Sequence, residues 1–317
     1  MVRQCSFTLG LVVLWAATGM ADVTLRQSVT LNFSSLFPEA VRSAMQESVK
    51  STLPSGTVLQ IKNGRAVSSS ATLTIMMEAD GNRITLLNPK SKQYADTTYS
   101  EYLDATRGAL KSVAPPAQAQ QAFQNLHHDV QTKKTGQFAM IQGVRAEESL
   151  IVATMQMPSP AGTMRMEMHY WIALPDDIRR VPALKELADY AEQSRRKLDA
   201  ANLVGSFTPM PGMTELMGAI RDLMKDNIGW PLKSSTKMYA PAMVQALQKA
   251  PQPGQSLDPN APMMEILMDV AELSTNPVPD SVFSVPADYQ AAPVEELVKA
   301  LMPVQSRPPA GAPAPSH

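Results

Sequence analysis

The chain has 317 residues, enough for one substantial folded domain, and 44% of them are hydrophobic. Its 28 basic and 29 acidic residues nearly cancel, so no positive field argues for a nucleic-acid partner. The one cysteine is Cys5, near the start, which excludes disulfides and cysteine-based metal sites from the rest of the chain.

Residues 1–21 have the pattern of a secretory signal peptide. Arg3 precedes an apolar run from Cys5 to Gly19, and small residues precede the expected cleavage site after Ala21. The apolar run is too short for a comfortable membrane span. We therefore expect an exported protein, periplasmic or secreted, from which this segment is removed.

The first half of the mature chain predicts strands and helices in alternation. Apolar residues at every second position indicate strands, turn residues such as Asn63-Gly64 end them, and apolar stripes at helical spacing indicate helices. The expected elements are a strand at 22–32, a helix at 37–53, strands at 57–61, 72–79, 83–87 and 92–94, and a helix at 99–113.

The second half continues in the same manner. The polar, Gln-rich segment 117–128 predicts a weak helix or a surface loop. The elements expected after it are strands at 138–141, 150–157 and 163–174, helices at 184–198 and 213–224, a strand at 230–239, a helix at 242–249, a strand at 263–273, an edge element at 281–285 and a helix at 294–301.

Many alternating strands with helices between them predict an α+β fold around one antiparallel sheet. No internal repeat and no long linker divides the chain, so we expect a single domain over residues 22–303. The end, residues 304–317, is rich in proline and alanine and is expected to be disordered.

Methionine is unusually frequent, with 21 residues against 7 phenylalanines and 3 tryptophans. The expected strand at 163–174 places Met164, Met166, Met168 and Tyr170 on one face, because successive side chains of a strand alternate. Such alternation is ordinary for a half-buried sheet. A methionine-rich surface is also adaptable, because the unbranched, polarisable side chain moulds to varied apolar ligands.

A set of motifs in this order resembles a known family. They are Gly136 to Gly143, the strand ending in Tyr170-Trp171, the segment Gly229 to Lys233, and the closing segment Pro279 to Tyr289, in which D-S-x-F-x-V-P-x-x-Y is the most specific element. Together they resemble a bacterial family of exported proteins of unknown function, which is similar in turn to the periplasmic lipoprotein-sorting chaperones, the outer-membrane lipoprotein carriers.

The resemblance implies a curved, incomplete β-barrel with helices on its concave side and an apolar cavity between them. It implies a non-enzymatic protein that binds an apolar or acylated ligand, without a cofactor, and that contacts the envelope membrane peripherally. The expected cavity wall consists of Met155, Met157, Met164, Met166, Met168, Tyr170, Met213, Met217, Ile220, Met264, Ile266 and Met268.

Two other functions remain open. The Met-x-Met spacing of Met155, Met157, Met164, Met166 and Met168 suits Cu(I), which prefers soft thioether ligands. His169 is expected to point to the opposite face and so to take no part. The fold could instead be an envelope scaffold or interaction module with a fully packed interior.

Enzymatic and other metal chemistry have little support in the sequence. There is no G-x-S-x-G nucleophile motif and no Gly-rich phosphate loop. The neighbours His127 and His128 would not converge on one ion in a helix or strand. Glu147, Glu148 and Glu167 are expected to be ordinary charged positions on strands.

Overall fold

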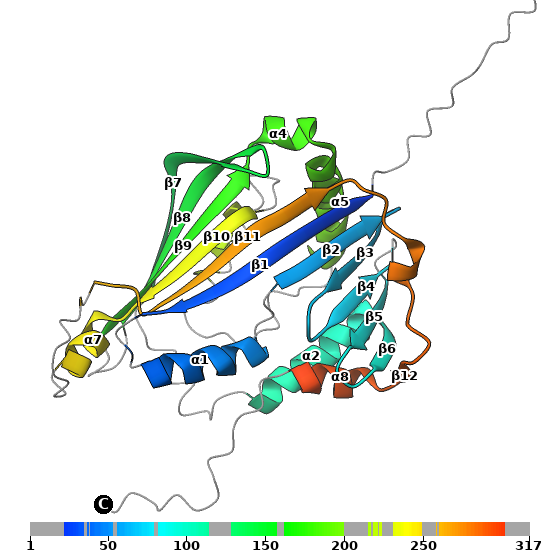
Figure 1. The fold of residues 1–317 in the computed structure, drawn as a ribbon, viewed down its shortest axis with the longest axis horizontal. Coiled ribbons are helices and arrows are strands. Elements are labelled where there is room, and N and C mark those ends of the chain that lie inside the picture. Colours follow the sequence, from blue (N-terminus) through cyan, green and yellow to red (C-terminus); the bar gives the residue numbers. More distant parts are fainter. Residues whose placement is uncertain are drawn as a thin grey trace, which may run out of the picture.

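The computed structural model describes residues 22–34, 37, 39–52, 56–78, 82–113, 128–156, 162–199, 215–216, 218–220, 222–223, 231–248, 258 and 260–301. These residues form one sheet of 12 strands together with a smaller number of helices. The strand order is β12-β6-β5-β4-β3-β2-β1-β11-β10-β9-β8-β7, so β12 and β7 are the two edges. The sheet is curved and does not close on itself (Figure 1).

The strands are β1 (Val23–Phe33), β2 (Gly56–Lys62), β3 (Arg65–Ser69), β4 (Thr74–Met77), β5 (Arg83–Asn88), β6 (Gln93–Thr98), β7 (His128–Ile141), β8 (Val144–Gln156), β9 (Thr163–Ala173), β10 (Pro231–Tyr239), β11 (Met264–Ser274) and β12 (Gln290–Ala291). All neighbouring strands are antiparallel except β12 and β6, which are parallel. The predicted fold class, α+β with a curved and unclosed antiparallel sheet, is therefore confirmed.

The longer helices of the described part of the chain are α1 (Glu39–Thr52), α2 (Tyr99–Val113), α4 (Pro175–Arg180), α5 (Pro182–Asp199), α7 (Pro241–Gln248) and α8 (Val294–Leu301). Short helical pieces also occur between residues 215 and 223. The start of α2 is fixed by a capping box, in which the backbone N–H of Glu101 donates to Thr98 Oγ1 at 3.2 Å. In return, the N–H of Thr98 donates to Glu101 Oε2 at 2.9 Å.

Tight turns set the register of two hairpins. Asn63 and Gly64, between β2 and β3, have φ values of 50° and 76°. Gln142 and Gly143, between β7 and β8, have φ values of 49° and 73°. Two successive residues with positive φ give the turn whose twist matches that of the flanking strands, which explains a glycine at the second position of each.

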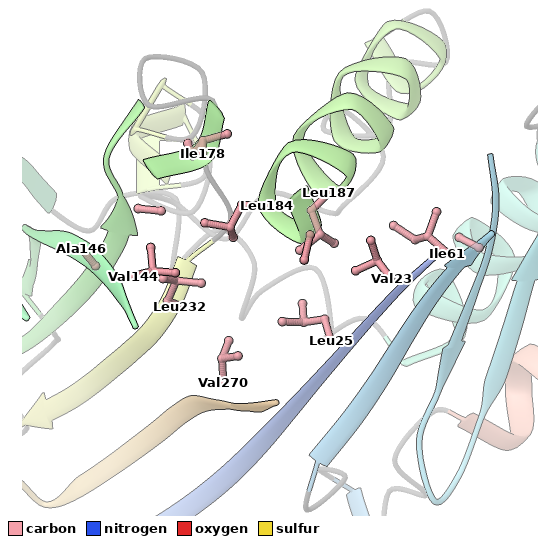
Figure 2. Packing of buried hydrophobic residues seen from close by; sticks show 13 residues of the cluster. Val23, Leu25, Ile61, Val144, Ala146, Ile178, Leu184, Leu187, Leu232 and Val270 are labelled. Carbon is pink, nitrogen blue, oxygen red and sulfur yellow. The ribbon is translucent and has the colours of Figure 1, made fainter. Parts of the chain in front are cut away.

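The largest core joins the two halves of the sheet through α4 and α5. Val23, Leu25 and Ile61 come from β1 and β2, and Leu184 and Leu187 come from α5. Figure 2 shows these side chains converging with those of the other half-sheet and of α4, which are Val144, Ala146, Ile178, Leu232 and Val270. Burial of this cluster ties α4 and α5 to both halves of the sheet.

A second core lies at the other end of the sheet, where α2 and α8 pack on β5 and β6. Ile84, Leu86 and Ala95 contribute from the strands, and Leu297 and Val298 from α8. All five are at most 4% exposed. The helices expected at 294–301 and at 99–113 are both confirmed. Both pack into this second core.

The closing segment corrects one prediction. Residues 281–285 are not an edge strand, because Asp280–Phe283 form a 3₁₀ helix and the edge strand is β12. Val282, Phe283, Val285 and Tyr289 pack instead against Val67, Met76 and Leu87. Pro279 and Pro286 flank the segment and lack backbone donors, which favours packing by side chains over strand pairing.

Some other helices and strands were not predicted, or begin at a different residue from the one predicted. β3 and α4 were not predicted, and β7 begins at residue 128, ten residues before its predicted start at 138. The early part of β7 is polar on both faces, so periodicity could not reveal it. The proposed weak helix or loop at 117–128 lies outside the described residues except for His128, which begins β7.

Candidate functional site

The described strand residues of the predicted cavity wall share one face of the sheet. Met155 pairs with Met164, and Tyr170 pairs with Ser234, which pairs with Met268. Directly opposite residues lie on the same face, as do residues two apart on one strand. We call this side of β8–β11 the methionine face, and its predicted members are Met155, Met164, Met166, Met168, Tyr170, Met264, Ile266 and Met268.

The methionine face is apolar except on β10, which contributes Ser234 and Thr236, and it is only partly buried. Of its predicted members Met168 is buried, at 4% exposure, and the others are half-buried. The face continues onto β1, where Val29 pairs with Met268 and Leu31 pairs with Ile266. Val29 and Leu31 are also half-buried, whereas Phe33, which pairs with Met264, is buried.

One described helical piece packs on part of the methionine face. Leu216 and Leu223, each 7% exposed, form a cluster with Ile151, Met168 and Ile172. The half-buried residues packed against this cluster are Val130, Ala153, Met166, Tyr170, Ala219 and Ile220. Leu216, Ile220 and Leu223 are spaced by four and three positions, as a helix facing the sheet requires.

The structure therefore brings Ile220, a member of the predicted wall, to the methionine face. The remaining members of the predicted wall, Met157, Met213 and Met217, lie outside the described residues. Burial raises the pKa of the Tyr170 phenol above its ordinary value. Its hydroxyl lies 3.8 Å from Met168 Sδ, so Tyr170 is held inside the apolar face by a weak sulfur contact.

One further methionine, Met238, lies on this face. Met166 of β9 lies opposite Met238 of β10, and Met238 lies opposite Met264 of β11. The strand at 230–239 was predicted, but the neighbours of Met238 were not, because a strand's periodicity does not reveal which residues become neighbours across strands.

The opposite side of β8–β11 carries a polar network centred on Glu148. The Glu148 side chain is 5% exposed, and its Oε1 lies 2.7 Å from His169 Nδ1. Thr135 Oγ1 donates to Oε2 at 2.5 Å. Burial pushes the pKa of Glu148 upward, but hydrogen bonds from Thr135 and His169 and nearby positive charge outweigh it and lower the pKa below its ordinary value.

His169 thus lies on the face opposite the methionines, as predicted. It pairs in register with Ser235, and its ring stacks on Trp171 with centroids 6.0 Å apart. Ser235 Oγ donates to Glu265 Oε1 at 3.0 Å and not to His169. Glu148, His169 and Ser235 therefore stand in adjacent strands without forming the hydrogen-bonded chain of a nucleophilic triad.

The other charges of this face pair with neighbours. Lys233 Nζ lies 3.7 Å from Asp269, and Tyr239 donates to Glu167 at 2.9 Å. Burial, the hydrogen bond to Glu167 and nearby charge raise the pKa of Tyr239 to about 12. Among the described residues, no group of three or more His, Cys, Asp or Glu residues could hold a metal ion. Glu148, Ser235 and Tyr239 of this face are buried, and we interpret the face as a polar surface cross-linked by its side chains.

Of the remaining candidate residues, the structure places His128 and Glu147. His128 is opposite Met155 in the β7–β8 register, and His127 lies outside the described residues. Glu147 points to the side opposite Glu148, as neighbours on a strand must, and pairs with Lys134 at 3.0 Å. The buried Glu148–His169 pair was not predictable from periodicity, because it forms only when β8 and β9 pair in the fold.

Comparison with known proteins adds no relative. No protein-family model matches the chain. No curated protein matches it significantly. Within the described part of the chain, no helix is both long enough and apolar enough to cross a membrane.

Proposed function

We propose that the methionine face binds an apolar or acylated ligand, as the resemblance to lipoprotein carriers implies, and that the protein acts without catalysis. The observation that carries this proposal is the half-buried state of an apolar surface that spans β8–β11 and β1. A fully packed sheet would bury Met264, Ile266 and Met268 as deeply as Leu86 or Leu187 in the two cores.

In this proposal the methionine face is the concave side of the curved sheet, and the helical piece with Leu216 and Leu223 lies over part of it. The acyl chain would occupy the remaining apolar area beside Ile266 and Met268. Each methylene group transferred from water contributes about 0.8 kcal/mol, so a chain of ordinary length gains enough to bind. Flexible methionines allow chains of different length and branching to fit.

The proposed location is the cell envelope, on the basis of the signal-like start of the chain. There the ligand would be a membrane lipid or the acyl group of a lipoprotein, reached by peripheral contact with the membrane.

A fluorescent acyl probe tests this site. We expect Ile266→Lys to weaken probe binding tenfold or more, because the change places a charge on the methionine face. Leu267→Lys is the matched control, since Leu267 is also half-buried on β11 but faces the opposite side. Circular dichroism would verify that both variants fold.

Equal probe binding by the two variants would refute this location of the site. If the wild-type chain binds no acyl probe at all, the ligand-binding proposal fails and the scaffold or interaction module becomes the better interpretation of the fold.

A further inference from the structure

We propose that Met166, Met238 and Met264 form a binding site for one Cu(I) ion on the methionine face. The three residues occupy one row on the neighbouring strands β9, β10 and β11. Directly opposite residues of antiparallel strands have Cβ atoms about 4.5–5.5 Å apart. Methionine has three rotatable side-chain bonds, so the three thioether sulfurs can turn toward one point between them.

Within β10, a methionine occurs on this face only at the position that belongs to the row. On the methionine face of β10 the other positions are Ser234 and Thr236, so this strand is not generally apolar there. Its methionine occurs where the neighbours on both sides are methionines. Ser234 is flanked by Tyr170 and Met268, and Thr236 by Met168 and Ile266. Met238 is therefore the residue of this face of β10 that has a thioether beside it on both neighbouring strands.

Backbone hydrogen bonds connect the strands near Met238 and Met264. The N–H of Met263 donates to the carbonyl oxygen of Met238 at 2.8 Å, and the N–H of Ser34 donates to the carbonyl of Met263 at 2.9 Å. The side chains of Met166, Met238 and Met264 are half-buried, so an ion can reach them without local unfolding.

The ligand chemistry selects the ion. Thioethers are soft, neutral ligands that favour Cu(I) over harder cations such as Mg²⁺ or Ca²⁺. Met164 precedes Met166 by two positions on the same face, roughly 6.8 Å along the strand, and is opposite Met155. Met164 is therefore placed to supply a fourth sulfur. The proposal needs no bound lipid and does not rest on the proposed function.

An anaerobic competition titration of Cu(I) against bicinchoninate, with the purified full chain, tests the site. We expect the wild-type protein to withdraw one equivalent of Cu(I), and Met238→Leu to weaken binding at least tenfold. Leucine keeps nearly the same volume and costs little stability. Met268→Leu is the matched control, because Met268 lies on the same face of β11 but is flanked by Ser234 and Val29; its affinity should equal that of the wild type.

Failure of the wild-type chain to withdraw Cu(I) would overturn the proposal, and so would equal affinities of the Met238→Leu and wild-type proteins. A second measurement uses Ag(I) as a redox-inert probe and the methyl NMR signals of the methionines. The signals of Met166, Met238 and Met264, assigned with leucine variants, should shift together. Shifts confined to other methionines would also overturn it.

Discussion

Glu148 is a carboxylate withdrawn from water but not left unpaired. Thr135 and His169 each contact one of its oxygens. Such pairing is needed, because a buried unpaired charge costs several kcal/mol. Since the pKa of Glu148 is lowered in the folded chain, its contribution to stability is complete above the unfolded value, about 4.3. It disappears as the pH falls through the folded value.

Thr135→Val should therefore destabilise the protein in a pH-dependent manner. The variant loses a hydrogen bond to a charged group, which is worth about 1.5–3 kcal/mol at pH 7. The loss should shrink at about pH 2.5, where carboxylates are protonated. Urea unfolding of the variant and the wild type at both pH values measures this loss of stability.

Thr132→Val is the control, because Thr132 is exposed on the same strand. Its effect should stay within about 0.5 kcal/mol at either pH. A pH-independent loss in Thr135→Val would show that the threonine acts by packing rather than through Glu148.

At the scale of single elements, glycine has different functions in β2 and α2. A Cβ at Gly56 would lie 2.5 Å from the carbonyl oxygen of Gln27 on β1. No atom lies within 4 Å of a Cβ at Gly108, in the interior of α2. The first glycine permits a close approach of two strands, whereas the second only weakens a helix.

Alanine at these two positions should change stability in opposite directions. Gly56→Ala should destabilise by about 1–3 kcal/mol, because β1 must move to relieve the contact. Gly108→Ala should stabilise by about 0.5–1 kcal/mol through helix propensity. Thermal unfolding of each variant measures its change in stability. A stabilising Gly56→Ala would show that β1 and β2 have room for a Cβ atom at residue 56.

Strong periodicity made most elements predictable. Helices α2 and α8 were predicted at their observed limits, and β1, β10 and β11 within a residue or two. Elements without periodicity were missed, as in the polar start of β7. The segment 281–285 was misread as a strand, because its apolar residues contact the sheet's side chains and not its edge.

At the scale of the whole molecule, local sequence does not determine which strands become neighbours. The chain places β11 beside β1, two segments separated by most of the sequence, and this pairing extends the methionine face from β8 to β1. The alternation on each strand was predictable, and so was the opposite orientation of His169. The row of Met166, Met238 and Met264 was not, because it exists only through long-range register.

The central claim is that the methionine face holds an acyl ligand, and native mass spectrometry of the protein purified from its host cells tests it most directly. We predict a mass excess equal to one lipid or acyl group on the wild-type chain and on Leu267→Lys, and its loss in Ile266→Lys. A spectrum showing only the bare chain for all three proteins would contradict the account.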